Sequence, residues 1–263
     1  MNKSISLFLA LATLFALSAC GNSDADSKDD SDLSYVQGNK KMIIGYTDYA
    51  PMNYTDENGT FTGFDTELAI AVCEELGVEP DFVEINWDTK EVELEAKSID
   101  CIWNGLTILP ERAAAMEITK PYVKNAQVVI VKDGTEYEDT ASLIGKTIVA
   151  EQGSAGEKTI QEDDNLKQAD YVAKMLQTEA LMEVKAGTAA AAVLDLTLAN
   201  TMTGEGTNYE DIIIVDHLAE EEYGVAFRKG SDLAAEVNKI FDDLLADGTM
   251  EALAEKYGLD LAE

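Results

Sequence analysis

Short apolar runs alternate with amphipathic stretches along most of the chain, and this rhythm restricts the fold more than any other feature. Residues 42–46 predict a strand, and the following helix, which we expect Asp65 to cap, carries its apolar residues on one face and ends at Gly77. Further strands are predicted at residues 82–85 and 99–103. Strand, helix and strand in this order indicate a parallel sheet covered by helices, so the predicted fold class is α/β.

The same alternation resumes after Ala126 and continues to the end of the chain. Two amphipathic helices close it: the first is expected to begin at a Ser231 cap, and the second follows residues 247–249 and ends near Gly258. Strands are predicted at residues 127–131, 147–150, 190–194, 212–215 and 223–227.

The first residues have the pattern of an export signal. Lys3 supplies a positive charge, and residues 5–17 form an apolar run that is too short to span a bilayer. Small residues then precede Cys20, which is the pattern of a bacterial lipoprotein signal. We therefore predict a signal peptide at residues 1–19 and lipidation of Cys20; the alternative is an ordinary secretory signal with a chance cysteine.

Residues 20–37 are predicted to be a lipidated flexible tether. They contain many aspartates and serines and few apolar residues, so the segment buries too little surface to offset the entropy lost on ordering. The tether would hold the protein at the outer face of the cell membrane through the lipid on Cys20.

The charge balance excludes one large class of partners. The chain has 51 acidic and 19 basic residues, and loss of residues 1–19 removes Lys3 alone, which leaves 33 net negative charges (51 − 18). A surface of this sign repels nucleic acids and anionic lipid headgroups. It attracts cationic solutes weakly, and it does not by itself identify a ligand.

The remaining cysteines and the single histidine do not predict a metal or a cofactor. Cys73 and Cys101 either form a disulfide, which an exported protein allows, or are two small buried hydrophobic residues, and we favour the second alternative. His217 has no cysteine or histidine partner at the spacing of a zinc site.

An ordered set of short motifs gives the chain a family resemblance. The set resembles the bacterial extracellular solute-binding proteins of family 3, the polar amino-acid-binding lipoproteins of ABC importers, over roughly residues 40 to 260. The motifs are GFDTELA at 63–69, NGLT at 104–107 with PER at 110–112, QGS at 152–154, Asp195 at a strand end, YGVAFRKGS at 223–231, and residues 247–258.

The resemblance implies a two-lobed, periplasmic-binding-protein-like type II fold with two hinge strands. Residues 38–126 plus 227–263 would form lobe 1, and residues 131–221 would form lobe 2. The ligand would lie between the lobes, where strand ends and helix N-termini meet. We expect a monomer that closes around an amino acid and then docks on the permease subunits of an ABC transporter.

The resemblance also implies roles for particular residues. An amino acid presents a carboxylate, which suits the planar fork of Arg112, and an ammonium group, which suits Asp195. Ser154 would reach the carboxylate from the second lobe. The full set of expected ligand-binding residues is Tyr49, Trp87, Asn104, Gly105, Leu106, Thr107, Arg112, Gln152, Ser154 and Asp195.

Each of these residues also has a plainer interpretation when it is considered alone. Arg112 fits a surface arginine at the start of a helix, Asp195 fits a helix cap, and Thr107 fits the end of a strand. Trp103 fits the cleft or the core equally well. Glu151 either faces the ligand, where with the aromatic rings it would favour lysine or arginine, or faces solvent.

The expected function is therefore binding and delivery rather than catalysis. The sequence contains no nucleophile elbow, zinc motif or phosphate loop. Two alternatives use the same fold: a dehydratase-like enzyme, with Glu151 as its general acid, and a soluble ligand-sensing adaptor for a membrane receptor.

Overall fold

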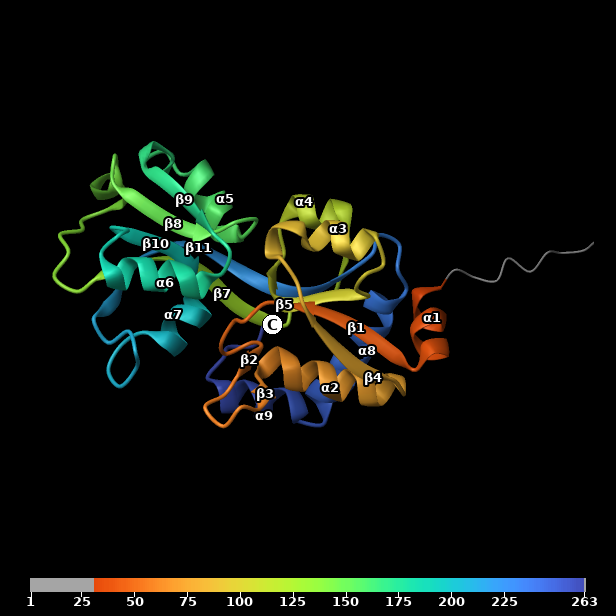
Figure 1. Ribbon diagram of the computed structural model, residues 1–263. Coiled ribbons are helices and arrows are strands. Elements are labelled where there is room, and N and C mark those ends of the chain that lie inside the picture. The colour runs from red at the N-terminus through yellow and green to blue at the C-terminus, as the bar shows by residue number, and fades with distance from the viewer. Residues whose placement is uncertain (1–30, 263) are drawn as a thin grey trace, which may run out of the picture. The chain divides into compact units, whose positions relative to one another are not determined.

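One nine-stranded sheet organises residues 31–262, the part of the chain that the computed structural model describes (Figure 1). The predicted signal peptide, Cys20 and the tether up to residue 30 lie outside the described residues. Among residues 31–262, no helix combines the length and the apolar character needed to cross a bilayer.

The sheet consists of two parallel groups joined by two long antiparallel strands. On one side β1 pairs with β4 and β5, and on the other β8 pairs with β9 and β10, all in parallel register. This arrangement confirms the predicted α/β class. The strands of the two groups are β1 (Lys41–Tyr46), β4 (Glu79–Glu84), β5 (Cys101–Thr107), β8 (Thr147–Glu151), β9 (Asp170–Lys174) and β10 (Ala191–Asp195).

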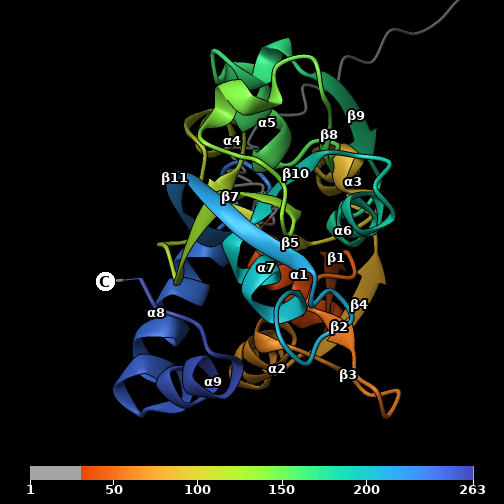
Figure 2. The ribbon, with the colours of Figure 1, turned by 90° about the vertical axis from the view of Figure 1, so that its left-hand side faces the viewer.

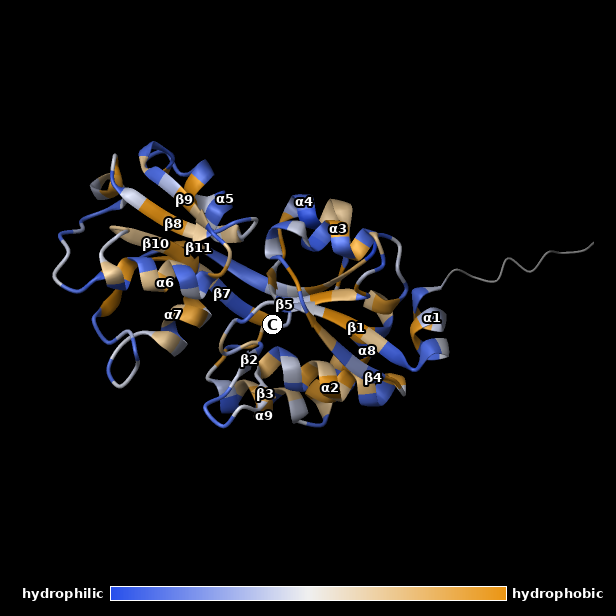
Figure 3. Cartoon of the chain, viewed as in Figure 1, coloured by the Kyte–Doolittle hydropathy of each residue, from blue (hydrophilic) through white to orange (hydrophobic). Residues whose placement is uncertain are grey.

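The long strands β7 (Val123–Lys132) and β11 (Ile212–Phe227) run side by side between the groups (Figures 1 and 2). β7 pairs with β10 at one end, and β11 pairs with β5 at the other. The prediction of separate strands at 212–215 and 223–227 is wrong, because the polar stretch between them also pairs with β7, with two register shifts. Figure 3 shows this stretch as hydrophilic, which hid the strand from a pattern based on apolar runs.

Helices cover both groups of strands, and the buried apolar residues of α2, α6 and α8 pack in one core with those of the sheet. The first group is covered by α2 (Phe64–Leu76), α3 (Lys90–Glu95), α4 (Pro110–Ala115), α8 (Leu233–Ala246) and α9 (Thr249–Tyr257). The second is covered by α5 (Ala155–Glu162), α6 (Gln177–Ala186) and α7 (Leu196–Met202). The short strands are β2 (Tyr54–Thr55), β3 (Phe61–Thr62) and β6 (Glu117–Ile118).

The core settles two of the sequence alternatives. Cys73 and Cys101 are free, buried thiols, so the favoured interpretation as small buried hydrophobic residues is confirmed. Trp103 is fully buried and its ring packs edge-on against Phe241 at a centroid distance of 5.8 Å. It is therefore a core residue.

Two helix starts differ from the prediction. Gly63, not Asp65, caps α2, because the chain enters the helix with φ 131° and a Cβ at this position would lie 2.2 Å from the Met52 carbonyl oxygen. Asp65 lies in the first turn, and its buried side chain is used elsewhere. The cap position of α8 is Asp232 rather than Ser231, and the Asp232 side chain makes no capping bond.

The predicted tether is wrong beyond residue 31, because helix α1 (Asp32–Asn39) begins there. Ser31 caps it by accepting a hydrogen bond from Ser34 N. Asp32 is buried and accepts a bond of 3.0 Å from Arg228 Nε. Arg228 also pairs with buried Asp100 at 3.3 Å. The partner that orders this polar segment is therefore far away in the sequence, out of reach of a local pattern.

Replacing Arg228 by alanine is expected to lower the free energy of unfolding by about 3–5 kcal/mol, because Asp32 and Asp100 then keep buried charges without a counterion. Urea unfolding measures the loss. Lys41→Ala serves as the control, since its ion pair with Asp81 is exposed and is worth under about 1 kcal/mol. Equal effects of the two substitutions would contradict the structural role of Arg228.

Candidate functional site

Side chains from both groups of strands meet around a small cavity with about 10 Å³ of free volume. Leu106 and Gln152 are the two predicted binding residues that do not line it: Leu106 lies in the core, and Gln152 donates to exposed Asp88. Ala155 and Gln177 line it although the sequence motifs did not indicate them. The lining residues are Tyr49, Trp87, Asn104, Gly105, Thr107, Arg112, Glu151, Ser154, Ala155, Gln177 and Asp195.

Arg112 lies on α4, which begins at Pro110 shortly after β5 and brings the guanidinium over the cavity. The side chain is buried, with 5 % of its surface exposed, so the interpretation as a surface arginine is wrong. Its Nη1 donates to the Thr107 carbonyl at 3.0 Å and its Nη2 to the Gly153 carbonyl at 2.9 Å. Among residues 31–262 it has no carboxylate within ion-pair distance, so a buried positive charge faces the cavity with neutral partners only.

Asp195 ends β10 and occupies the cap position of α7, yet its side chain makes no capping bond, so the capping interpretation is wrong. Its Oδ1 accepts from Asn125 Nδ2 at 2.7 Å and from Gln127 Nε2 at 2.6 Å, and its Oδ2 accepts from Gln177 Nε2. Burial raises the pKa of Asp195, while the amide donors lower it. The carboxyl is thus held in place by neutral amides.

Glu221 of β11 lies next to Asp195, although no sequence motif indicated it. Its Oε1 accepts from Thr107 Oγ1 at 2.9 Å and from the same two amides as Asp195. Thr107 is therefore more than the end of a strand, because its hydroxyl connects β5 to the middle of β11. The acidic residues around Glu221 resemble an ordinary solvated stretch, which is why no pattern singled it out.

Two aromatic residues form one wall of the cavity. The Tyr49 hydroxyl hydrogen-bonds to those of Thr197 and Tyr223, and the ring is almost fully buried. Gly105, at φ 58°, lies so close to this ring that a Cβ would be 2.7 Å from Tyr49 Cε1. Trp87 is also buried in the wall. Glycine at position 105 therefore keeps the space beside Tyr49 open.

Asn104 lines the cavity, but its amide is occupied within the protein. Nδ2 donates to the Thr47 carbonyl at 2.9 Å and to Asn53 Oδ1 at 2.7 Å, and Oδ1 accepts from Thr47 N at 3.1 Å. The side chain thus fixes the loop after β1, which carries Tyr49, against β5.

Two further titratable residues lie in the walls: Glu151 of β8 in the second wall, and Lys90 of α3 beside Trp87 in the first. Glu151 lines the cavity with 3 % of its surface exposed, so the solvent-facing interpretation is wrong. Burial, and then the Asp195 carboxyl, raise the pKa of Glu151 well above its usual range. Lys90, which the sequence did not indicate, is also buried, and burial lowers its pKa to about 8.

Gly153 is one of the points where the two walls touch. Its carbonyl accepts from Lys90 Nζ at 2.9 Å as well as from Arg112, and a Cβ on it would lie 3.0 Å from the Asp88 Cα. Ser154 follows and caps α5 by accepting from Glu157 N at 3.1 Å, which leaves its hydroxyl proton to donate. The walls are therefore in contact around the cavity.

Asp65 holds the strand that carries Gly105. Its Oδ2 accepts from Gly105 N at 2.7 Å, and its Oδ1 accepts from the Tyr122 hydroxyl at 2.8 Å. Burial raises the pKa of Asp65 to about 7, although both hydrogen bonds favour the charged form.

The chemistry of the site suits a small molecule that carries both signs of charge. Arg112 offers donors on one side, and Asp195 offers acceptors on the other. The described part of the chain has no group of three or more histidine, cysteine, aspartate or glutamate residues placed to hold a metal ion.

Comparisons with known proteins match nearly the whole chain. The model of the bacterial extracellular solute-binding proteins, family 3, matches residues 42–260. The arginine-binding extracellular protein ArtP of Bacillus subtilis (strain 168) is 28% identical over 262 residues, which cover 98% of each chain.

Solved structures agree with this match. Tv2483, crystallised with L-arginine, superimposes with a TM-score of 0.81 at 27% identity and covers 88% of this chain and 96% of its own. The ancestral amino acid-binding protein AncCDT-1, a precursor of cyclohexadienyl dehydratase, has a TM-score of 0.78 at 30% identity and covers 86% of this chain and 99% of its own.

Replacing Asp65 by asparagine should change how stability depends on pH. The pKa of the Asp65 carboxyl rises from 3.8 to about 7 on folding. The free energy of unfolding of the wild type therefore falls as pH increases between these values, by up to about 1.4 kcal/mol per pH unit. The substituted amide does not titrate, so the unfolding free energy of the variant minus that of the wild type should increase from pH 4 to 7 and then level off.

Urea unfolding at several pH values measures this difference. Asp56→Asn is the matched control, because Asp56 lies outside the core and hydrogen bonds from Thr60 and Asn58 lower its pKa. The unfolding free energy of Asp56→Asn minus that of the wild type should not increase between pH 4 and 7. A difference for Asp65→Asn that is constant with pH would contradict the raised pKa.

Proposed function

Because the chain belongs to the bacterial extracellular solute-binding proteins of family 3, we propose that it captures an amino acid outside the cytoplasm and delivers it to the permease subunits of an ABC-type importer. The observation that carries this proposal is the buried pair of unmatched charges on one cavity, Arg112 and Asp195. A zwitterion supplies the opposite charge to each of them.

The carboxylate of the ligand would bind at Arg112. A guanidinium can donate to both carboxylate oxygens, and a buried charged hydrogen bond of this kind is worth more than a neutral one. The Ser154 hydroxyl and the N-terminus of α5 lie on the same cavity and would add donors from the other wall.

The ammonium group of the ligand would bind at Asp195. Its two oxygens already accept from amide groups of Asn125, Gln127 and Gln177, which orient the carboxyl without neutralising it. Burial of a carboxylate without a counterion costs desolvation free energy, and the attraction of a bound ammonium group offsets much of that cost.

We propose lysine or arginine as the preferred ligand, because the buried side chain of Glu151 and the aromatic rings of Tyr49 and Trp87 line the same cavity and would bind a cationic side chain. The similar proteins ArtP and Tv2483 are described as arginine-binding and arginine-bound, which supports the choice.

Closure of two lobes would couple binding to transport. We propose lobe 1 at residues 38–126 plus 227–263 and lobe 2 at 131–221, with β7 and β11 as the hinge between them. Arg112 and Asp195 then belong to different lobes, and a ligand that contacts both shifts the population toward the closed form. The permease would bind that form.

The location follows from the family in outline. Its members are extracellular solute-binding proteins, and we propose that this one acts as a monomer held to the cell membrane by a lipid on Cys20. The negative surface makes a nucleic-acid partner unfavourable.

Binding without turnover is the proposed activity. A dehydratase-like reaction is the second candidate, because the buried carboxyl of Glu151 on the cavity resembles a general acid and the similar AncCDT-1 precedes an enzyme. Recovery of the bound amino acid unchanged after prolonged incubation, followed by NMR, would exclude that reaction for that ligand.

Replacing Arg112 by alanine is expected to weaken L-arginine binding by about 2–4 kcal/mol, since the ligand carboxylate loses its charged partner. Isothermal titration calorimetry on the mature protein measures the affinity. Lys239→Ala is the control, because it removes an exposed cation of α8, a helix that does not line the cavity.

The amide of arginine identifies which ligand group the guanidinium binds. Argininamide lacks the carboxylate, so its affinity should be low for the wild type and should change little further in Arg112→Ala. If Arg112→Ala binds L-arginine as tightly as the wild type does, Arg112 is not part of the site.

A further inference from the structure

Asp195 and Glu221 form a pair of carboxyls that share their hydrogen-bond donors. Asn125 Nδ2 donates to Asp195 Oδ1 at 2.7 Å and to Glu221 Oε1 at 2.6 Å. Gln127 Nε2 donates to the same two oxygens at 2.6 Å and 2.9 Å. The two oxygens therefore lie no farther apart than two hydrogen-bond lengths.

The side chains that donate these bonds are neutral. They are amides and the Thr107 hydroxyl, so none of the bonds brings a positive charge to the pair. Gln127 is fully buried, and its Oε1 accepts no hydrogen bond in the described part of the chain. Its NH₂ group donates to both carboxyls. Two adjacent carboxyls in such surroundings do not both ionise easily.

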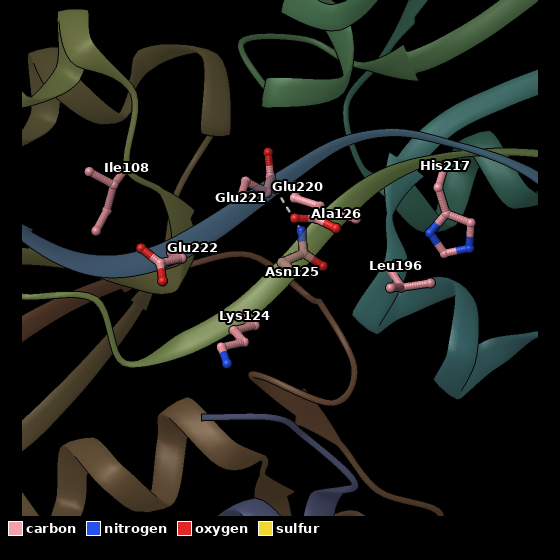
Figure 4. Close-up of a pocket in the computed structure, with 9 residues that line it drawn as sticks. All are labelled: Ile108, Lys124, Asn125, Ala126, Leu196, His217, Glu220, Glu221 and Glu222. Carbon is pink, nitrogen blue, oxygen red and sulfur yellow. Dashed lines mark hydrogen bonds between the residues drawn. The ribbon is translucent and has the colours of Figure 1, made fainter. Parts of the chain in front are cut away.

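The position of Glu221 connects the cavity to solvent through the hinge. It lies on β11 opposite Asn125 of β7, and the two side chains meet across these strands (Figure 4). Glu221 is half-buried and also lines an outer groove of about 690 Å³ on the hinge strands. A proton on this carboxyl therefore has a route to water.

The groups around the pair set its charge balance. Arg112 is a cation that acts on both carboxyls, and the Tyr49 and Tyr223 hydroxyls face them from the core. Burial, and then Asp195, raise the pKa of Glu221 to about 8. The other charged or titratable neighbours are Glu151 and Lys90 on the cavity side and Lys124, His217, Glu220 and Glu222 in the groove.

We propose that Glu221 is a specificity-determining residue of the ammonium subsite, and that the Glu221–Asp195 pair holds one shared proton which the ligand's ammonium group displaces. This inference rests on the proposed function. On binding, the O–H bond of the carboxyl breaks, the proton passes to solvent by way of the groove, and an N–H of the ligand donates in its place. The pair changes from one negative charge to two, and the bound ammonium group adds one positive charge, so the net charge of the pair together with this group is unchanged.

The exchange gives binding a defined pH dependence. Below the apparent pKa of the ligand-free pair, each bound ligand releases up to one proton, so affinity should increase up to about tenfold per pH unit. Above about pH 8 the pair is already deprotonated and the affinity should level off. The pair also favours primary ammonium over neutral groups at this position.

Glu221→Gln tests the assignment because glutamine imitates the protonated carboxyl. Its oxygen accepts from Asn125, Gln127 and Thr107, and its NH₂ donates to Asp195 where the acid O–H did. His217→Gln is the matched control, since it makes a substitution to the same residue in the same groove without touching the pair. Glu221→Asp keeps a carboxyl, so it checks that a substitution at this position does not by itself abolish the release of a proton on binding.

The measurement is calorimetry with L-arginine at pH 6.5 in buffers of different ionisation enthalpy, which counts the protons released per ligand. The wild type and His217→Gln should each release close to one proton, Glu221→Asp a similar amount, and Glu221→Gln close to none. Release by Glu221→Gln equal to that of the wild type, or no release by the wild type, would overturn the proposal.

The proton on the ligand-free pair is tested separately by urea unfolding without ligand. The midpoint of Glu221→Gln minus that of the wild type should increase from pH 5 to pH 8, because only the wild type loses stability as its raised carboxyl ionises. A constant midpoint difference would overturn the shared proton. Absence of arginine binding at every pH would instead refute arginine as the ligand in the proposed function, whatever the unfolding data show.

Discussion

The site depends on two opposite charges, those of Arg112 and Asp195, which are buried on one cavity and have no charged partner of opposite sign within the described part of the chain. Arg112 is bonded to backbone carbonyls and Asp195 to side-chain amides, so neither is neutralised by these bonds. Removing such groups from water costs several kcal/mol each unless an opposite charge arrives. A zwitterionic solute supplies both charges at once, which makes an empty closed cavity less favourable than a filled one.

The sheet explains how these charges are brought together. Arg112 follows β5 in the first group of strands, and Asp195 ends β10 in the second. The groups are joined through β7 and β11, so the polar middle of these strands lies beside the site. Glu221, Asn125 and Gln127 come from that stretch. The connection between the groups and the proposed ammonium subsite are thus built from the same residues.

The α/β fold class and the family could both be predicted from the sequence, and the structure and comparisons confirm them. Most residues that line the cavity were also indicated, because Arg112, Thr107 and Asp195 stand at strand or helix ends with recognisable spacing. Their roles in ligand binding stay predictions. Gly105 was indicated through its motif, whereas the role of Gly63 as the cap of α2 was missed, because its φ of 131° depends on the contact with the Met52 carbonyl.

The remaining features depend on contacts between distant residues. Glu221 and Lys90 lie in charged stretches that resemble exposed surface, and their burial follows only from the packing of the two walls. Helix α1 has the polar composition of a tether. It is ordered by a contact with Arg228, almost two hundred residues later in the sequence, which a local pattern does not reveal. Hydropathy patterns report local burial, so they do not reveal buried charges that are paired through the fold.

The most direct test of the account is a crystal structure of the mature protein with L-arginine. We expect the α-carboxylate to lie within hydrogen-bond distance of Arg112 and the α-ammonium group within hydrogen-bond distance of Asp195, between the aromatic wall and α5. Arginine bound elsewhere, for example in the outer groove beside His217, with Arg112 and Asp195 still bonded only to the protein, would contradict it.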